Sequence, residues 1–512
     1  MNITSNKFLR GMLSLWSLCG ISILLFTAVL YVKWNGFAEQ GEVNFSSVSW
    51  LLYQGYPLYT DIDYPGRYSL QHGPIVYLIA GAIMKLFGPS YITAKVSGII
   101  ALVLSILTSW VWFSKLIDKK YAFFLLGLET WLLFHWHHAY FIRPDSMMLL
   151  CVVVSMYIVT TKKSTLWLIL GTAIPLAVMA NLKIHGVLYF LPIIFIAYQR
   201  LGKKLLLYVG ALSALLGGLP FLLPQISLNN YLLWLFQSFH HGFTFSNFIP
   251  KVAMFMMLFL LPITIGIVHG VNMRSFYLRN KHLIQTLLFS LIVISIISSK
   301  GGSGTNHIMP FIPIFIYFIA QIICEAKDKD DSLAVKCKPD FSWKVSSIVL
   351  ALLLVTITAS GINTDKRLIK VILASDRTAM VQDVQGIEKL YRGKTMEVGY
   401  GEDKSYPVYR DLIPLPVFNG SPLLIEAVAL GDMNLAGWSL PASTIKSLEE
   451  GTIQVWLIPK GEAPFAMNFG SKSHLCNDVF RETFFKNYSK VSSTAFFDIW
   501  VHANTVGVSN SK

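Results

Sequence analysis

The sequence predicts a polytopic α-helical membrane protein with a mixed α/β domain at its C-terminal end. Of its 512 residues, 54% are apolar and only 14% carry a charge, whereas soluble domains carry about 25% charged residues. Apolar runs near 20 residues long recur from residue 11 to residue 361, and such a run can cross a hydrocarbon layer of about 30 Å. The runs are continuous rather than alternating, which favours helices over a β-barrel.

These runs predict eleven transmembrane helices. They lie near residues 11–32, 92–113, 121–135, 146–161, 165–181, 185–199, 205–224, 251–271, 283–299, 306–323 and 343–361. The first run is long and lacks a small-residue cleavage site, which favours an uncleaved span over a signal peptide. The segment 74–88 is also apolar, but its 15 residues suit an interfacial or re-entrant helix better than a span.

The basic residues orient these spans. With the N-terminus inside, the segments predicted on the cytoplasmic side hold 18 lysines and arginines, and the longer outer segments together with the adjoining span ends hold eight, as the positive-inside rule requires. A twelfth span at 74–88 would reverse the predicted orientation of every later span. Orientation therefore accounts for much of the net charge of +14, and no basic and aromatic tract indicates nucleic-acid binding. The five cysteines are scattered and predict neither a disulfide framework nor a CxxC metal site.

Residues 362–512 have the pattern of a small soluble domain on the outer side of the membrane. Short alternating runs, TMEVGY, TIQVWLIP and AFFDIWVHA, predict strands, and helix-like patterns at 380–392 and 478–488 lie between them. Residues 1–361 form the predicted transmembrane domain, whose longest outer loop, 33–91, contains the interfacial helix.

Ionisable side chains concentrate on the predicted outer face, where eight of the twelve histidines fall. Ionisable groups at membrane depth are costly, so they usually line a cavity and mark function. The sequence therefore predicts one outward-facing polar chamber. The first outer loop also holds four carboxylates, Glu39, Glu42, Asp61 and Asp63, and carboxylates can deprotonate a hydroxyl acceptor or hold a divalent ion. The loop also carries a run of five tyrosines, whose ring faces suit sugar rings: Tyr53, Tyr56, Tyr59, Tyr64 and Tyr68. An ordinary wet loop is the alternative interpretation.

The stretch FHWHHAYFIRPDS, residues 134–146, ends an apolar run with imidazoles and charges. The spacing of His135, His137 and His138 fits a shared metal ion, and it fits an interfacial belt equally well. Asp145 fits a helix cap that accepts backbone N–H groups. A cap does not explain Arg143, which is therefore a candidate for function.

The order of the outer motifs resembles that of the multi-spanning glycosyltransferases of the GT-C fold. These include protein O-mannosyltransferases, lipid A aminoarabinose transferases and RgtA/B/C/D-like bacterial proteins. The matching elements are EQGE (39–42), GYPLYTD (55–61), HGPIVYLIAGAIMKLFG (72–88), Lys95, RPD (143–145), NLKIHG (181–186) and GTNHIMPFIPIF (304–315). The chain departs from the family at EQGE, where an Asp-Glu pair is usual, and at Lys95, where arginine is more common.

The resemblance implies a transferase that moves a sugar from a polyprenyl-phosphate carrier to an acceptor outside the cytoplasm. It implies a multi-pass protein of the cell (inner) membrane whose site faces the periplasm or exterior. The acceptor base would be Glu39 or Glu42, with Asp61 and Asp63 as alternatives. The donor phosphate would be held by Lys95, Arg143, Lys183, His185 and His307. The substrate would be lined by Tyr64, His72, Asp145 and Asn306.

The expected partners are the lipid-linked sugar donor, a glycan, lipid or protein acceptor, and membrane lipids. The sequence indicates no required cofactor, although a divalent metal stays open. A nucleotide-sugar enzyme would carry a cytoplasmic Rossmann-like domain, which the sequence does not show, and RGKT (392–395) lacks the first glycine of a P-loop. A secondary transporter or flippase, or a non-catalytic transferase relative, is the alternative. The lack of an internal repeat argues against a transporter.

Overall fold

The computed structural model describes residues 7–301, 303–332, 341–374, 377–469 and 474–506. The chain divides into two compact units, each assembled from three separate segments. The membrane unit comprises Met1–Leu30, Gly98–Gly218 and Gly242–Lys370, and the loop unit comprises Tyr31–Ser97, Leu219–His241 and Val371–Lys512. The first outer loop and the C-terminal residues therefore belong to the same unit.

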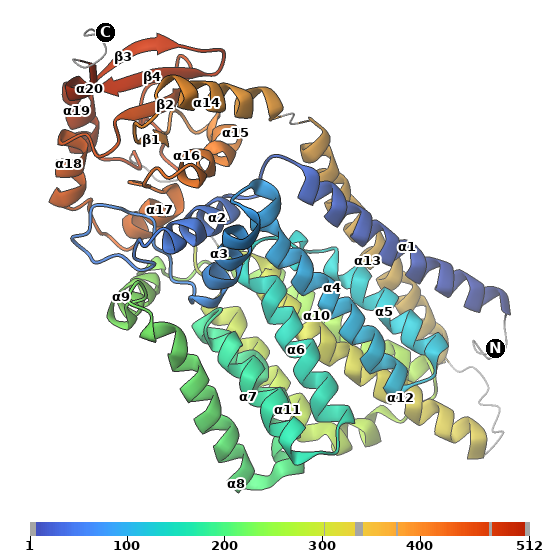
Figure 1. Ribbon diagram of the computed structural model, residues 1–512. Helices are drawn as coiled ribbons and strands as arrows, with labels where there is room; N and C mark the ends of the chain where they lie inside the picture. Colours follow the sequence, from blue (N-terminus) through green and yellow to red (C-terminus); the bar gives the residue numbers. More distant parts are fainter. Residues whose placement is uncertain (1–6, 302, 333–340, 375–376, 470–473, 507–512) are drawn as a thin grey trace. The chain divides into compact units, whose positions relative to one another are not determined.

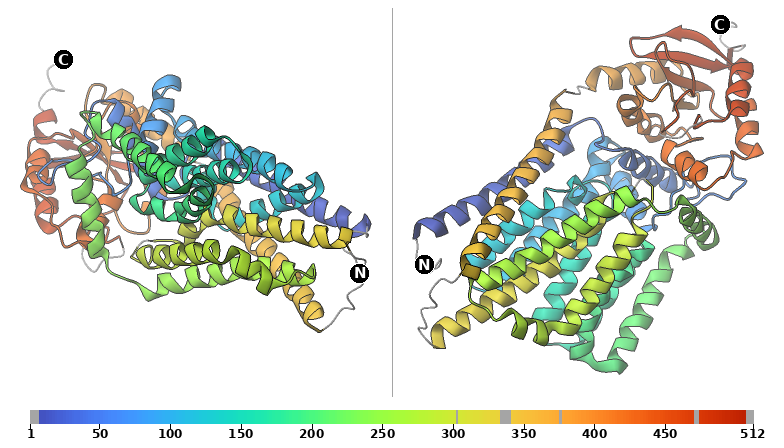
Figure 2. Two further views of the ribbon diagram at one scale, coloured as in Figure 1. Left: turned by 90° about the horizontal axis from the view of Figure 1, so that it is seen from below. Right: turned by 180° about the vertical axis from the view of Figure 1, so that it is seen from behind.

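The membrane unit is built from long helices that follow the predicted apolar runs (Figure 1). Its α-helices are α1 (Lys7–Lys33), α4 (Tyr91–Leu116), α5 (Lys119–Leu133), α6 (Pro144–Thr161), α7 (Thr165–Ala180), α8 (Leu191–Gly218), α10 (Phe245–Val268), α11 (Met273–Ile297), α12 (Ile312–Ser332) and α13 (Phe341–Ala374). The ends of α1 and α4 extend into the loop unit. Three 3-10 helices join them, η1 (His137–Ala139), η2 (Ile184–Phe190) and η5 (Thr305–Phe311). The helices α7 and α8 lie side by side (Figures 1 and 2).

Each predicted span coincides with a helix, which confirms a multi-pass membrane protein. Among the described residues, eight helices are long and apolar enough to cross a membrane. Apolar helices at Thr165–Ala180 and Leu206–Leu222 are shorter, and α5 has only 15 residues. The count of eleven spans therefore stays a prediction. Gly202, with a φ of 71°, interrupts α8 at the short loop predicted between two spans, because glycine adopts this left-handed conformation without a steric penalty.

The loop unit combines the first outer loop with the C-terminal residues. Its α-helices are α2 (Gln40–Tyr53), α3 (Ile75–Phe87), α9 (Leu228–Gln237), α14 (Thr378–Leu390), α15 (Tyr406–Tyr409), α16 (Pro414–Phe418), α17 (Ala427–Leu435), α18 (Ala442–Glu449), α19 (Asp478–Asn487) and α20 (Ala503–Val506). Its 3-10 helices are η3 (Leu219–Leu222), η4 (Ser238–His241) and η6 (Arg410–Leu412). The 13 residues of α3 fall short of a membrane span, which agrees with the predicted interfacial helix.

One four-stranded sheet lies in this unit, with strand order β1-β2-β4-β3. Its strands are β1 (Met396–Val398), β2 (Val455–Pro459), β3 (Tyr488–Ser493) and β4 (Phe497–His502). The pair β1 and β2 is parallel, and the other two pairs are antiparallel. The three predicted strands correspond to β1, β2 and β4. The edge strand β3 was not predicted, because YSKVSS is mostly polar and only its first residue is buried.

Backbone hydrogen bonds join the first outer loop to the C-terminal residues within the loop unit. The N–H of Arg67 donates to Leu424 O at 2.7 Å, and the N–H of Glu426 donates to Arg67 O at 2.9 Å. Helix α16 also packs on α2. The domain boundary predicted after residue 361 falls inside α13, and a separate domain over 362–512 stays a prediction.

Candidate functional site

Three helix starts in the membrane unit bring together a group of polar residues, here called the Asp145 cluster. Arg143 and Asp145 open α6, Lys183 and His185 open η2, and Asn306 and His307 lie in η5. Arg143 and Lys183 are the residues that immediately precede α6 and η2, and both have an extended backbone conformation. A helix start leaves backbone N–H groups without partners inside the helix, so polar side chains are compatible with these positions.

Asp145 is the centre of this cluster. Its Oδ1 atom lies 2.9 Å from the ammonium of Lys183 and 2.8 Å from Nδ2 of Asn306. Its Oδ2 atom lies 3.3 Å from Nε of Arg143. Asp145 lies in the first turn of α6, whose N-cap is Arg143, and its carboxylate ties three chain segments together.

The cluster carries more positive than negative charge. The side chains of Lys183 and Asp145 are only 3% and 1% exposed, whereas that of Arg143 is 17% exposed. One carboxylate thus neutralises only one of two cations. The guanidinium of Arg143 is the more accessible of the two cations and is suited to paired hydrogen bonds with phosphate oxygens.

Two histidines predicted to hold phosphate lie beside each other in the same unit. The rings of His185 and His307 have centroids 5.2 Å apart. The hydroxyl of Tyr189 donates to His307 O at 2.9 Å, which fixes the backbone of η5 against η2. The buried atoms Nε2 of His185 and Nδ1 of His307 have no hydrogen-bond partner among the described residues. Both nitrogens are available to a ligand that reaches this point.

The segment before Arg143 is held close to α4. A side chain on Gly98 would collide with the carbonyl oxygens of Tyr140 and Phe141, so glycine allows this approach. Trp136 donates from Nε1 to Oγ1 of Thr305 at 2.8 Å, which links the same segment to the start of η5. Sequence reasoning missed both contacts, since they join residues far apart in the chain.

In the loop unit, Glu42 is fully buried in a second group of residues, here called the Glu42 cluster. Its Oε1 atom accepts a hydrogen bond from the hydroxyl of Tyr31. Its Oε2 atom accepts from the backbone N–H groups of Ala38 at 2.8 Å and Glu39 at 3.2 Å. Glu39 is the N-cap of α2, and Glu42 completes a capping box with it. The sequence EQGE, which replaces the Asp-Glu pair usual in the resembling family, thus has a local structural role at the start of α2.

The surroundings of Glu42 bring the pKa of its carboxyl close to neutral pH. Burial, and then the charge of Glu39, raise the pKa of Glu42 from 4.5 to about 7, and the Tyr31 hydroxyl and Lys95 oppose this change. A carboxyl with a pKa near the working pH can both take and release a proton, which is what a general base requires. Glu39 is half-buried and lies at the N-terminal end of α2.

Lys95 is fully buried beside this carboxyl. Its ammonium donates to Tyr31 O at 2.8 Å and Trp34 O at 2.7 Å, and it lies 4.4 Å from the centroid of the Tyr31 ring. Cations near the end of a helix satisfy carbonyls that lack partners inside the helix. The observed contacts of Lys95 are therefore with the end of α1.

The remaining first-loop candidates are less enclosed. Asp61 and Asp63 are exposed on a turn, where Asp61 Oδ1 accepts from the N–H of Asp63 at 3.0 Å. Tyr64 is half-buried and packs edge-on against Tyr68. His72 is half-buried, and its ring lies 5.1 Å from that of Phe45. The loop unit thus encloses Glu42 and leaves the two aspartates in solvent.

The three histidines proposed for a metal have separate surroundings. Nδ1 of His135 lies 3.0 Å from the hydroxyl of Ser360 on α13, apart from His137 and His138, whose rings both lie tilted against that of Phe141. Among the described residues, no group of three or more His, Cys, Asp or Glu side chains is arranged to hold a metal ion. The metal site stays a prediction of the sequence.

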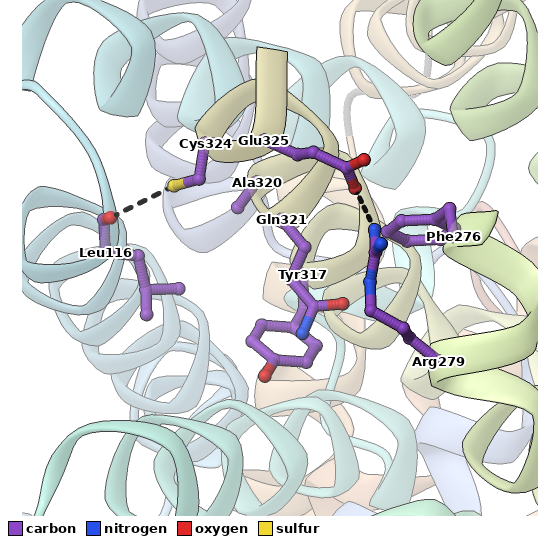
Figure 3. Close-up of a pocket in the computed structure, with 8 residues that line it drawn as sticks. All are labelled: Leu116, Phe276, Arg279, Tyr317, Ala320, Gln321, Cys324 and Glu325. Atoms are coloured by element: carbon purple, nitrogen blue, oxygen red, sulfur yellow. Dashed lines mark hydrogen bonds and ion pairs between the residues drawn. The ribbon is translucent and has the colours of Figure 1, made fainter. Parts of the chain in front are cut away.

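A cavity of about 440 Å³ lies beside α12 and is also lined by residues from the end of α4 and the first turns of α11 (Figure 3). An ion pair of Arg279 and Glu325 borders it, and Cys324 contacts Leu116 O at 3.5 Å. Of the described residues that line it, none belongs to the predicted site. The polar clusters and this cavity are therefore separate features.

Comparison with known proteins identifies the fold. No family model and no curated protein sequence matches the chain. The structure is similar over nearly its full length to ArnT from Cupriavidus metallidurans. Against ArnT bound to undecaprenyl phosphate the TM-score is 0.55 at 11% identity, covering 95% of this chain and 97% of that one. Against the apo form the TM-score is 0.57 at 12% identity, covering 96% and 98%. This chain has the GT-C fold.

The GT-C fold predicted from the motif order is thus confirmed, although the sequence identity is very low. Sequence reasoning found Glu42, Asp145 and Lys183, but it missed Tyr31 as the partner of Glu42. The only available signal was a tyrosine at the end of the first span, which also fits an interfacial aromatic belt.

Proposed function

We propose that this protein is an integral membrane glycosyltransferase. It moves a sugar from a polyprenyl-phosphate carrier to a glycolipid, polysaccharide or protein acceptor, in the cell (inner) membrane and on its periplasmic or exterior face. The observation that carries this proposal is the full-length similarity to a membrane protein solved with undecaprenyl phosphate bound. The two buried polar clusters support it, because they supply a base and a positively charged site.

In the proposed reaction, the acceptor hydroxyl attacks the anomeric carbon of the donor sugar. The bond between that carbon and the phosphate oxygen breaks, the polyprenyl phosphate leaves with an added negative charge, and the base takes the hydroxyl proton. Among the four carboxyl candidates, Glu42 is the proposed base because burial brings its pKa to about 7. Glu39 is the proposed positioning residue, since it caps the helix that carries Glu42.

The proposed donor-phosphate site is the Asp145 cluster. Arg143 is the most exposed cation there, and a fixed positive charge stabilises the phosphate as negative charge develops on it. Asp145 holds the ammonium of Lys183, and the amide of Asn306 donates to the same carboxylate oxygen and orients it. His185 and His307 offer ring nitrogens to phosphate oxygens, and Tyr64 and His72 are proposed to line the acceptor.

The proposal is tested with the purified protein in lipid nanodiscs and synthetic undecaprenyl-phosphate sugars. Release of free undecaprenyl phosphate, and the mass of the acceptor glycan, are measured for the natural chain and for Arg143→Ala. The matched control is Lys446→Ala, which removes a positive charge from an exposed pair on α18. We expect release to fall at least about tenfold in Arg143→Ala and to stay unchanged in the control. Release measured after metal chelation tests the divalent metal that the sequence leaves open.

A deletion strain provides the cellular test. Mass analysis of its surface glycans should show the loss of one sugar, which would also identify the acceptor. Intact donor that accumulates on the opposite leaflet, with no loss from purified nanodiscs, would instead indicate a flippase. Donor that is neither consumed nor moved would indicate a non-catalytic relative.

A further inference from the structure

A second cavity, of about 590 Å³, lies in the C-terminal part of the loop unit. One wall is formed by Trp438 and Asn434 at the end of α17, and the other by His474, Asn477 and Asp478 at the start of α19. None of these residues belongs to the predicted transferase site. The cavity combines one large aromatic ring with amide, imidazole and carboxylate groups.

The backbone fixes Trp438 in place. Helix α17 ends in a Schellman motif, in which the N–H of Gly437 donates to Asn434 O at 3.0 Å and the N–H of Trp438 donates to Met433 O at 2.9 Å. Gly437 has a φ of 76°, a conformation that favours glycine. The position of the indole therefore does not depend on a flexible loop.

A second tryptophan, Trp234, packs against the indole of Trp438. The rings of Trp234 and Trp438 lie 6.3 Å apart at 54°, a favourable tilted geometry. Trp234 is itself 2% exposed, and its Nε1 atom donates to Thr60 O at 2.8 Å. Trp438 remains half-buried at the cavity, so the pair presents one supported aromatic face.

The opposite wall offers polar groups with spare hydrogen-bonding capacity. Asn477 lines the cavity and caps α19, where its side-chain oxygen accepts from the N–H of Phe480 at 3.0 Å, so the cap does not use its amide NH₂ group. Nδ1 of His474 lies 2.9 Å from Ala466 O, so Nε2 is the ring nitrogen left for a ligand. Asp478 is exposed in the first turn of α19. These groups include both donors and acceptors.

The charge of the cavity selects the kind of ligand. The described residues that line it include no lysine or arginine, and Asp478 contributes a negative charge. A phosphate or acidic sugar would therefore meet the negative charge of Asp478, and no described lining residue supplies a cation to offset it. A neutral sugar, by contrast, has apolar C–H faces that stack on an indole and hydroxyls that both donate and accept.

We propose that this cavity binds a neutral oligosaccharide segment of the acceptor. This inference rests on the proposed function, since it gives the transferase a separate holding site for its acceptor glycan. A holding site adds the same binding energy before and during the reaction, so it lowers KM for the acceptor and leaves kcat unchanged.

Binding is measured without donor, on the full chain in nanodiscs. The probes are the neutral and acidic fractions of the surface glycans that mild acid releases from the host, with chitohexaose and hexagalacturonate as defined neutral and acidic standards. Trp438→Ala should weaken binding of the neutral fraction about tenfold or more. Asp478→Asn tests the opposite wall with little change in shape and should weaken it about threefold.

Glu482→Gln is the matched control, because Glu482 lies one turn further along α19 and is exposed outside the cavity lining. It should bind like the natural chain. Equal binding by Trp438→Ala, a preference for the acidic fraction, or binding only of peptides would overturn the proposal. Thermal unfolding of each variant separates lost binding from lost folding, and Asp478→Asn stays informative if Trp438→Ala does not fold.

Donor cleavage decides the proposed function independently. If undecaprenyl phosphate is released from the donor and no neutral glycan binds, the acceptor-holding site fails and the transferase stands. If glycan binds and no donor is ever cleaved, the transferase fails instead.

Discussion

Asp145 in the membrane unit and Glu42 in the loop unit are both buried carboxyl groups with 0% exposure, yet their partners differ. Asp145 meets two cationic side chains and an amide. Glu42 meets a phenol and two backbone N–H groups, with the carboxylate of Glu39 and the ammonium of Lys95 nearby, and the effect of burial outweighs that of Lys95. The first environment balances a permanent negative charge, whereas the second disfavours ionisation.

This difference assigns separate chemistry to the two clusters. A carboxylate that is paired with cations orients them and does not exchange its proton at neutral pH. A carboxyl that is held by neutral donors and destabilised by burial can exchange its proton near neutrality. The first kind positions a charged donor, and the second kind activates a hydroxyl.

The largest effect is expected from Lys183→Met. It leaves Asp145 buried without its shortest ion pair, and breaking a buried pair in this way costs about 3–5 kcal/mol. Thermal unfolding in detergent should show a large loss of stability. Lys446→Met removes a lysine from an exposed pair and should unfold like the natural chain.

The double variant Lys183→Met with Asp145→Asn tests the cause of that loss. Removing the carboxylate charge should recover much of the stability, because the uncompensated charge is then gone. If the double variant is no more stable than Lys183→Met alone, the ion pair is not what holds the three helix starts together.

Glu42→Gln should lower the transfer rate about 100-fold or more, because an amide cannot accept the hydroxyl proton. In the natural chain the rate should rise with pH through about 7, where Glu42 loses its proton, and this rise should vanish in the variant. Glu450→Gln changes an exposed glutamate and should keep both the rate and the rise.

The same substitution has an opposite signature in stability. Because folding raises the pKa of Glu42, protonation stabilises the folded state at low pH, and this contribution is lost as the pH rises from 4.5 through about 7. Glu42→Gln should therefore unfold at a temperature that varies less between pH 5 and pH 8. If Glu42→Gln keeps the pH profile of activity of the natural chain, Glu42 is not the base.

Periodicity and charge located the long helices of the membrane unit before any contact was known, but they located only part of the loop unit, where α2, α9 and α15 to α18 were not predicted. The apolar runs marked the helices of the membrane unit, and the alternating runs marked three of the four strands. The polar strand β3 escaped because it is an edge strand with little burial. Sequence pattern reports which side of an element is buried, and β3 has almost no buried side.

The site was predictable as a set of residues but not as a set of contacts. Lys183 and Asp145 were assigned different roles, whereas they form one ion pair. Glu39 and Glu42 looked interchangeable in EQGE, yet one is half-buried and the other is fully buried. Burial and pairing between distant segments depend on the packed chain, and a single sequence does not specify them directly.

A smaller effect is expected from Gly98→Ala. The added methyl group meets the backbone carbonyls of Tyr140 and Phe141, and overpacking of this kind costs about 1–3 kcal/mol. The segment that leads to Arg143 should shift, so donor cleavage should fall more than stability. Gly210→Ala on α8 places a methyl group in open space and should be neutral or slightly stabilising. Equal behaviour of the two variants would show that the approach of α4 does not position Arg143.

The smallest effect is expected from Asp61→Asn and Asp63→Asn. Both aspartates are exposed on a turn, where water screens their charge, and Asp61 caps only the N–H of Asp63. An asparagine oxygen can accept the same hydrogen bond, so each variant should keep the transfer rate to within about twofold. Initial rates at saturating donor provide the measurement. A loss of about 100-fold in either variant, together with an unaffected Glu42→Gln, would move the base from the buried carboxyl to the exposed turn and reverse the distinction drawn between the two environments.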